Sequence, residues 1–180
     1  MLGRNALNAP PDFSLTALYD ALDHERQSRS TTWAVVAREI NARFRDVRGH
    51  RAIAVSTITG LAGKQSVEGD GVLQMLLWLR RSPESFVPGF EGANAERYRL
   101  KELGPTQILR WDTRALYAAL SHQRQARGVS WRQVAAEIRG CTPAMLTRLE
   151  RGGRTVLPGV MRLVAWTGQP AAAFTRASDW

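Results

Sequence analysis

The sequence contains a single cysteine, Cys141, and three histidines among its 180 residues. One cysteine excludes an intrachain disulfide and a thiolate metal cluster. No stretch approaches the run of about 20 apolar residues that crosses a bilayer, and the first residues lack the apolar core of a signal peptide. We therefore expect a cytoplasmic protein with no membrane partner.

Lysine is also scarce, because Lys64 and Lys101 are the only two, so arginine carries nearly all of the positive charge. The formal net charge is +9. A charge of this sign and size favours a polyanionic partner, and nucleic acid is the commonest one for a small protein. A GC-rich coding sequence produces the same excess of arginine and alanine, so charge alone leaves the partner open.

The residue patterns that enzymes need are missing as well. The sequence shows no nucleophile beside a base, no acid–base pair, no glycine-rich phosphate loop and no cluster of metal ligands. We therefore predict a protein that is not an enzyme, needs no cofactor and holds no metal. The thiol of Cys141 is expected to act as a small buried hydrophobic group rather than as a nucleophile.

What the sequence does contain is an internal repeat. Residues 14–40 align without a gap on 112–138, with a shift of 98 and about half of the residues identical. Residues 55–87 align on 143–175 with a shift of 88. The difference, 98 − 88 = 10 residues, is a basic insertion in the first copy at about 42–53. A repeat of this length predicts two units of one fold.

The repeat sets the expected domain organisation. We predict a first domain at 12–87, a linker at 88–109, rich in glycine, proline and charge, and a second domain at 110–176. Apolar residues recur at helical spacing in both copies, as in Leu18, Ala21 and Leu22, and no convincing alternating pattern of a strand is present. The predicted fold is all-α, with two tandem five-helix domains.

Each predicted helix has a recognisable start. Polar residues suited to cap a helix precede the apolar stripes of the first and second helices in both copies and the third helix in the second copy. Pro143 follows the last of these caps, at the first helical position, where proline is tolerated. The expected caps are Ser14, Thr32, Asp112, Ser130 and Thr142. Trp33 and Trp131, and Trp78 and Trp166, recur at equivalent positions and are expected to pack in the core.

Within the second copy, "SWRQVAAEIRGCTPAMLTRLERGGRT" (130–155) resembles the helix-turn-helix of Cro and repressor proteins, often called Xre-like. The similarity rests on Val134 and Ala135 in a capped helix, a turn at Gly140, a further helix, and the ending Glu150-Arg151-Gly152; it extends over 112–174. The first copy departs from the family pattern, since the insertion replaces the turn and Ala62-Gly63-Lys64 replaces the ending. Its membership is inferred from the second copy.

This resemblance implies which residues face DNA. In the family the third helix enters the major groove. The base-facing positions become Ala144, Met145, Thr147 and Arg148, with Ser56, Thr57 and Thr59 in the first copy. Contacts to the DNA backbone are expected from Ser130, Thr142, Arg151, Arg154, Thr32, Lys64, Arg48 and Arg51. Among these residues only Arg148 has a guanidinium group that can make a bidentate contact to guanine. Few direct contacts to bases are therefore expected, and contacts to the DNA backbone should provide much of the affinity.

The function predicted in this way is a bacterial, sequence-specific regulator of transcription that binds double-stranded DNA and is associated with the nucleoid. Its two domains on one chain would act as a pseudo-dimer, or two chains would form a homodimer. The alternative is a protein-interaction module on the same fold, antitoxin-like or an adaptor, in which one or both reading helices have lost their base contacts. In an intermediate case only the second copy binds DNA. The insertion is either an arm that contacts DNA or a solvated basic loop.

Overall fold

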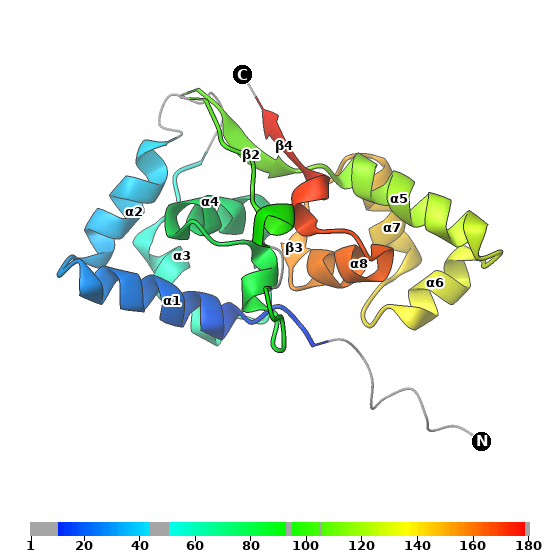
Figure 1. Cartoon of the computed structure of the whole chain (residues 1–180), viewed down its shortest axis with the longest axis horizontal. Coiled ribbons are helices and arrows are strands. Elements are labelled where there is room, and N and C mark those ends of the chain that lie inside the picture. The colour runs from blue at the N-terminus through cyan, green and yellow to red at the C-terminus, as the bar shows by residue number, and fades with distance from the viewer. Residues whose placement is uncertain (1–10, 44–50, 93–94, 105, 179–180) are drawn as a thin grey trace.

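Eight α-helices are the main elements of the part of the chain that the structure describes (Figure 1). This structure is a computed structural model, and it describes residues 11–43, 51–92, 95–104 and 106–178. The first repeat contributes α1 (Leu15–Ser28), α2 (Trp33–Ala42), α3 (Val55–Thr59) and α4 (Gly69–Leu79). The second repeat contributes α5 (Thr113–Ala126), α6 (Trp131–Glu137), α7 (Pro143–Glu150) and α8 (Gly159–Thr167).

Short 3-10 turns and short strands complete the described part of the chain. The turns are η1 (Leu61–Gly63), η2 (Pro83–Phe86), η3 (Ala95–Tyr98) and η4 (Ala171–Phe174). The strands are β1 (Val67–Glu68), β2 (Ile108–Trp111), β3 (Val156–Leu157) and β4 (Thr175–Ser178). β1 pairs with β3 and β2 pairs with β4, both antiparallel.

The protein is therefore mostly helical, as predicted, but an all-α fold of two five-helix domains is not confirmed. The sequence analysis missed the strands because each has only two to four residues, too few for an alternating pattern to be visible. The pair β1–β3 also joins the two repeats to each other. The stretch 88–109, predicted as a linker, contains η3 and part of β2, and Leu100, Ile108 and Leu109 are buried.

The predicted caps are confirmed at all five helix starts. The side chain of each cap accepts a hydrogen bond from the backbone N–H three residues later. Ser130 and Gln133 form the reciprocal capping box that the sequence shows only in the second repeat. α3 and α8 have no such cap, because Ala54 and Pro158 precede them and offer no side-chain acceptor.

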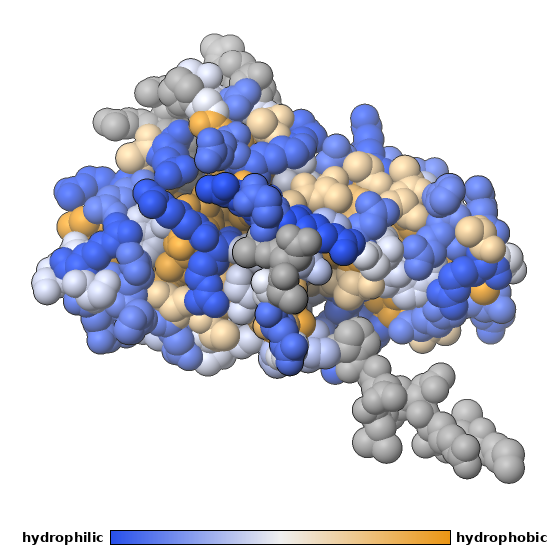
Figure 2. Space-filling view, viewed as in Figure 1, coloured by the Kyte–Doolittle hydropathy of each residue, from blue (hydrophilic) through white to orange (hydrophobic). Residues whose placement is uncertain are grey.

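The predicted apolar stripes face a core that includes residues of both repeats. Leu18 and Leu22 of α1 are fully buried, as are their equivalents Leu116 and Leu120 of α5. The stripes of α2 and α6 pack into the same core through Val36 and Val134 and through Ile40 and Ile138. Because these apolar residues point inward, the face shown in Figure 2 is mostly hydrophilic.

The equivalent tryptophans make equivalent contacts, which extends the sequence repeat to three dimensions. In the first repeat the indole N–H of Trp78 donates to a carboxylate oxygen of Glu39 at 2.9 Å, and the guanidinium of Arg29 lies 4.8 Å from the ring centre. The same three-residue contact in the second repeat is made by Trp166, Glu137 and Arg127. Trp33 and Trp131 are half-buried, and each stacks on the tyrosine of the preceding helix.

The pairing of β1 with β3 relates the repeats by a local two-fold axis. Glu68 pairs with Val156, and the repeat shift gives 68 + 88 = 156, so this residue faces its own equivalent. An antiparallel pair of equivalent residues requires a two-fold axis between them. In Figure 1 α1 and α5 lie on opposite sides of this central pairing, as do α2 and α6.

Two polar contacts at equivalent positions also connect the repeats, but they are made by different side chains. The buried side chain of Gln74 in α4 donates to the carbonyl oxygen of Leu109, just before α5, at 2.7 Å. Its equivalent, Arg162 in α8 (74 + 88 = 162), binds both carboxylate oxygens of Asp12, just before α1, at 2.6 and 2.9 Å. Each repeat thus holds the chain segment that leads into the first helix of the other.

Two carboxylates, half-buried Asp70 and buried Glu84, also make contacts between the repeats. Asp70 accepts from the backbone N–H of Trp111 at 2.9 Å and lies 3.3 Å from the guanidinium of Arg110. Glu84 accepts from the backbone N–H of Ala171 at 2.6 Å. Burial raises the pKa of both carboxyl groups, although these N–H donors oppose the shift. The repeats therefore share buried polar contacts as well as a core.

The sheet of β2 and β4 belongs to the second repeat. The sequence explains why the corresponding segments of the first repeat are less suited to form strands. In the first repeat the corresponding segments contain Pro10, Pro11 and Pro88, which have no N–H to donate to a strand partner. One hydrogen bond is common to both repeats, from the first cap residue to the end of the last turn. It joins Ser14 N–H to the Phe86 carbonyl at 2.8 Å and Asp112 N–H to the Phe174 carbonyl at 2.7 Å.

Gly69 of α4 lies where the two repeats pack closely against each other, and its substitution tests this packing. A Cβ at this position would lie 2.7 Å from Thr155 Oγ1 and 2.8 Å from Trp111 Cδ1, both in the second repeat. We expect Gly69→Ala to lower the free energy of unfolding by about 1 to 3 kcal/mol through overpacking, measured by urea denaturation. Gly71→Ala in the same helix is the control, because its Cβ would make only an ordinary contact at 3.4 Å. Equal stability of the two variants would contradict the packing described here.

Candidate nucleic-acid interface

The turn between α6 and α7 has the backbone geometry that the family resemblance implies. Gly140 adopts φ +71°, a conformation that favours glycine. An added Cβ would also lie 2.9 Å from the guanidinium of Arg162, which donates to the Arg139 carbonyl at 3.1 Å. Since Arg162 also binds Asp12, the first repeat helps to hold the turn that leads into α7. Cys141 is half-buried here, and burial raises the pKa of its thiol.

α7 buries one face and exposes the other. Leu146 and Leu149 are 4% and 2% exposed and pack in the core. Ala144, Thr147 and Arg148 are exposed on the helix, as base-facing residues must be. Met145 was also predicted to face DNA, but it is half-buried and packs against the core. The exposed face of α7 is thus smaller than the sequence suggested.

The end of α7 explains the ending Glu150-Arg151-Gly152. Gly152 adopts φ +77°, and its N–H donates to the Leu149 carbonyl at 2.9 Å. Gly153 N–H donates to the Arg148 carbonyl at 2.8 Å, so the two bonds close the helix in the manner common at helix ends with glycine. This closure directs the chain away from α7 and leaves the side chains of Arg151 and Arg154 exposed.

A further arginine lies beside this helix end. A Cβ added at Gly152 would lie 3.0 Å from Nε of Arg114, so the side chain of Arg114 crosses the end of α7. Arg114 is exposed and comes from the first turn of α5. The sequence analysis did not predict this residue, because its separation from α7 along the chain gives no sign of the contact. With Arg148, Arg151 and Arg154 it forms what we term the α7 arginine cluster.

The helix-start residues predicted to bind the DNA backbone are engaged within the protein. The hydroxyl oxygens of Thr142 and Thr32 accept from the backbone N–H groups of Met145 and Val35. The backbone N–H of Ser130 donates to the side-chain oxygen of Gln133 at 2.7 Å. In this structure the capping box therefore occupies the amide that Ser130 would offer to a phosphate.

The first repeat presents a weaker version of the same surface. α3 has five residues, with Ile58 buried, Ser56 and Thr59 exposed, and Thr57 half-buried. The hydroxyl of Thr59 donates to the Val55 carbonyl at 3.2 Å. Lys64 and Arg51 are exposed. Arg48, together with most of the basic insertion, lies outside the described residues.

The two repeats differ sharply in charge at this surface. The equivalents of Arg148, Arg151 and Arg154 are Gly60, Gly63 and Ser66, at a shift of 88. α3 packs beside α2 in one repeat, and α7 packs beside α5 and α6 in the other (Figure 1). Since a two-fold axis relates the repeats, α3 and α7 lie at the same level along that axis. The end of α7 is therefore rich in arginine, whereas the positions equivalent to these arginines in the first repeat are uncharged.

No group of three or more histidine, cysteine, aspartate or glutamate side chains is arranged to hold a metal ion within the described ranges. None of the helices in that part of the chain is long and apolar enough to cross a membrane.

Comparison with known proteins finds no matching family model, no matching curated protein and no matching solved structure. The functional interpretation therefore depends on the geometry of the two repeats and on the helix-turn-helix resemblance of residues 130–155.

Proposed function

We propose that this protein is a sequence-specific, double-stranded DNA-binding regulator of transcription in which α7 and α3 are the reading helices of one pseudo-dimeric molecule. The observation that carries the proposal is the α7 arginine cluster at the end of a capped helix whose exposed face is held above a buried leucine pair. A helix in this arrangement can enter a major groove with cations placed against the flanking phosphates.

The local two-fold axis supports a pseudo-dimer. Duplex DNA has its own two-fold axes, and dimeric helix-turn-helix proteins place their reading helices in successive major grooves on one face of the duplex. Here the pairing of Glu68 with Val156 gives one chain the same symmetry. Because buried contacts join the repeats, the spacing of α3 and α7 is set by packing rather than by a tether. We therefore propose two helical repeats, within 12–87 and 110–176, that dock on DNA as one body.

The residues on α7 have different proposed tasks. Arg148 projects from the exposed face and has the donor fork that matches guanine O6 and N7. Ala144 offers an apolar contact to a thymine methyl group. Arg151 and Arg154 follow the end of α7 and Arg114 lies beside it, where contacts to phosphates set the register of the helix on the duplex. Since the first repeat lacks these arginines, the bound site is expected to be asymmetric.

A second candidate function applies to the first repeat alone. α3 is short, has no side-chain cap and carries glycine at the position of Arg148. These features favour a repeat that contacts another protein, as in an adaptor or antitoxin-like module, while the second repeat binds DNA. The two proposals differ in whether the bound DNA contains one block of specified bases or two.

Arg148→Ala tests base reading by α7. We expect it to relax sequence preference at one position of the bound DNA, with a loss of discrimination of about 1 to 3 kcal/mol there and little change elsewhere. Sequencing of duplexes bound from a random pool measures this preference. Arg176→Ala, which removes an exposed arginine of β4, is the control and should keep the wild-type preference. An unchanged preference in Arg148→Ala would show that this docking is wrong.

Arg154→Ala tests phosphate contact beyond α7. Loss of one phosphate contact should weaken binding to all duplexes alike and make the slope of log affinity against log salt shallower by about 1. Titration of one mixed-sequence duplex at several salt concentrations gives the slope, again with Arg176→Ala for comparison. A slope unchanged by Arg154→Ala but reduced by Arg176→Ala would place the DNA on a different surface.

A further inference from the structure

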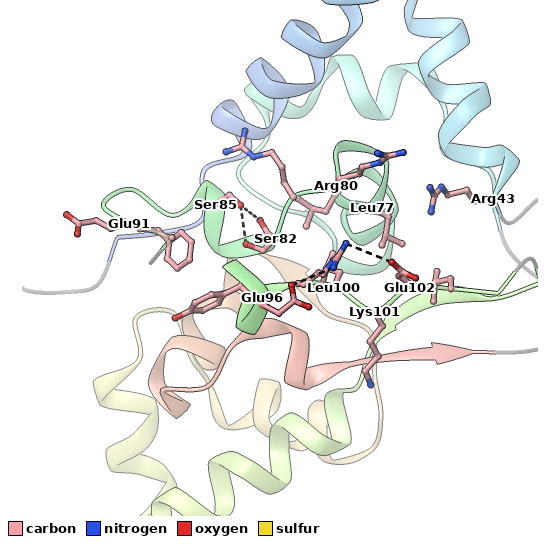
Figure 3. A pocket seen from close by; sticks show the side chains of 17 residues that line it. Arg43, Leu77, Arg80, Ser82, Ser85, Glu91, Glu96, Leu100, Lys101 and Glu102 are labelled. Atoms are coloured by element: carbon pink, nitrogen blue, oxygen red, sulfur yellow. Dashed lines mark hydrogen bonds and ion pairs between the residues drawn. The ribbon is translucent and has the colours of Figure 1, made fainter. Parts of the chain in front are cut away.

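A cavity of about 1100 Å³ lies between the end of α4, η2 and the segment that connects the repeats (Figure 3). Part of its wall is apolar and is formed by Leu77, Leu100 and Leu103. Arg43, which follows the last residue of α2, and Arg80, which follows α4, also line it. In Figure 3 both arginines lie toward the same end as Leu77, whereas Glu91 points away from the cavity.

At the end of the cavity where Arg43 and Arg80 lie, positive charge exceeds negative charge. Neither Arg43 nor Arg80 forms an ion pair with a carboxylate of the described residues. The two nearby glutamates that line the cavity, Glu96 and Glu102, lie 3.6 and 3.9 Å from the guanidinium of Arg99. Two guanidinium groups are therefore left facing one space beside an apolar wall.

The second repeat provides an internal comparison. Arg80 adopts φ +55°, a left-handed conformation that disfavours a side chain. Its equivalent, Gly168, adopts φ +68° and has no such cost. Ser82 and Ser85 of the cavity likewise correspond to Pro170 and Ala173. The first repeat thus has an arginine at a position where the backbone favours glycine. It also has serines where the second repeat has proline and alanine.

The geometry points to this cavity as a binding site for an anionic amphipathic small molecule. Its acidic group, a carboxylate, sulfonate or phosphate, binds the guanidinium groups of Arg43 and Arg80. Its apolar body packs against Leu77, Leu100 and Leu103. Charge-assisted hydrogen bonds from two arginines beside an apolar wall select an acid over a neutral molecule of the same shape. This inference does not depend on the proposed binding of DNA.

The test uses the fluorescent sulfonate 8-anilinonaphthalene-1-sulfonate with the full chain at about 0.15 M salt, where weak surface attraction is screened. We expect saturable binding, displacement by decanoate, and no displacement by decan-1-ol at the same concentration. Arg80→Gly, which copies the second repeat and relieves the left-handed arginine, should weaken binding roughly tenfold or more. Arg43→Ala should weaken it similarly.

Arg132→Ala is the matched control, because it removes an exposed arginine of α6 that does not line the cavity. It should leave the affinity for the probe unchanged. Absence of saturable binding to the wild-type protein would overturn the inference. So would equal affinities of wild type and Arg80→Gly, equal weakening by Arg132→Ala, or displacement by decan-1-ol as effective as that by decanoate.

Discussion

The antiparallel pairing of Glu68 with Val156 is the constraint on which the rest of the structure depends. It joins a residue to its own equivalent, and so it relates two sequence repeats by a two-fold axis inside one chain. The polar contacts of Gln74 and Arg162 and the close contact at Gly69 follow from this pairing. An interface of this kind normally forms between two identical subunits. Here it lies within the chain, so the two halves are free to diverge.

The divergence is concentrated on the surfaces rather than in the core. The leucine stripes, the tryptophan–glutamate contacts and the caps of the first two helices occur in both repeats. By contrast, the cations that follow α7 have glycine and serine as equivalents after α3, and Arg80 has Gly168 as its equivalent. A conserved scaffold thus presents an arginine-rich helix end in the second repeat and an arginine-lined cavity in the first.

Local features of the fold could be predicted from the sequence, and contacts between distant segments could not. Helix starts depend on residues one to three positions apart, so Ser130 with Gln133 and Thr142 with Pro143 were predictable. β1 and β3 have two residues each and gain their pairing only when the repeats meet. The position of Arg114 beside α7 depends on packing of α5, and the half-burial of Met145 depends on the core behind it. The sequence therefore predicted α7 and three of the four arginines of the α7 arginine cluster. It did not predict which residues of this surface are exposed, as Arg114 and Met145 show.

The most direct test of a pseudo-dimeric DNA reader is selection of duplexes from a random pool by the intact protein at about 0.15 M salt. The account predicts enrichment of an asymmetric site with two blocks of specified bases about 10 base pairs, or a multiple of this, apart, and a stronger preference in one block. A single enriched block would contradict reading by α3 and assign DNA to the second repeat alone. No enrichment of any sequence would contradict the central claim.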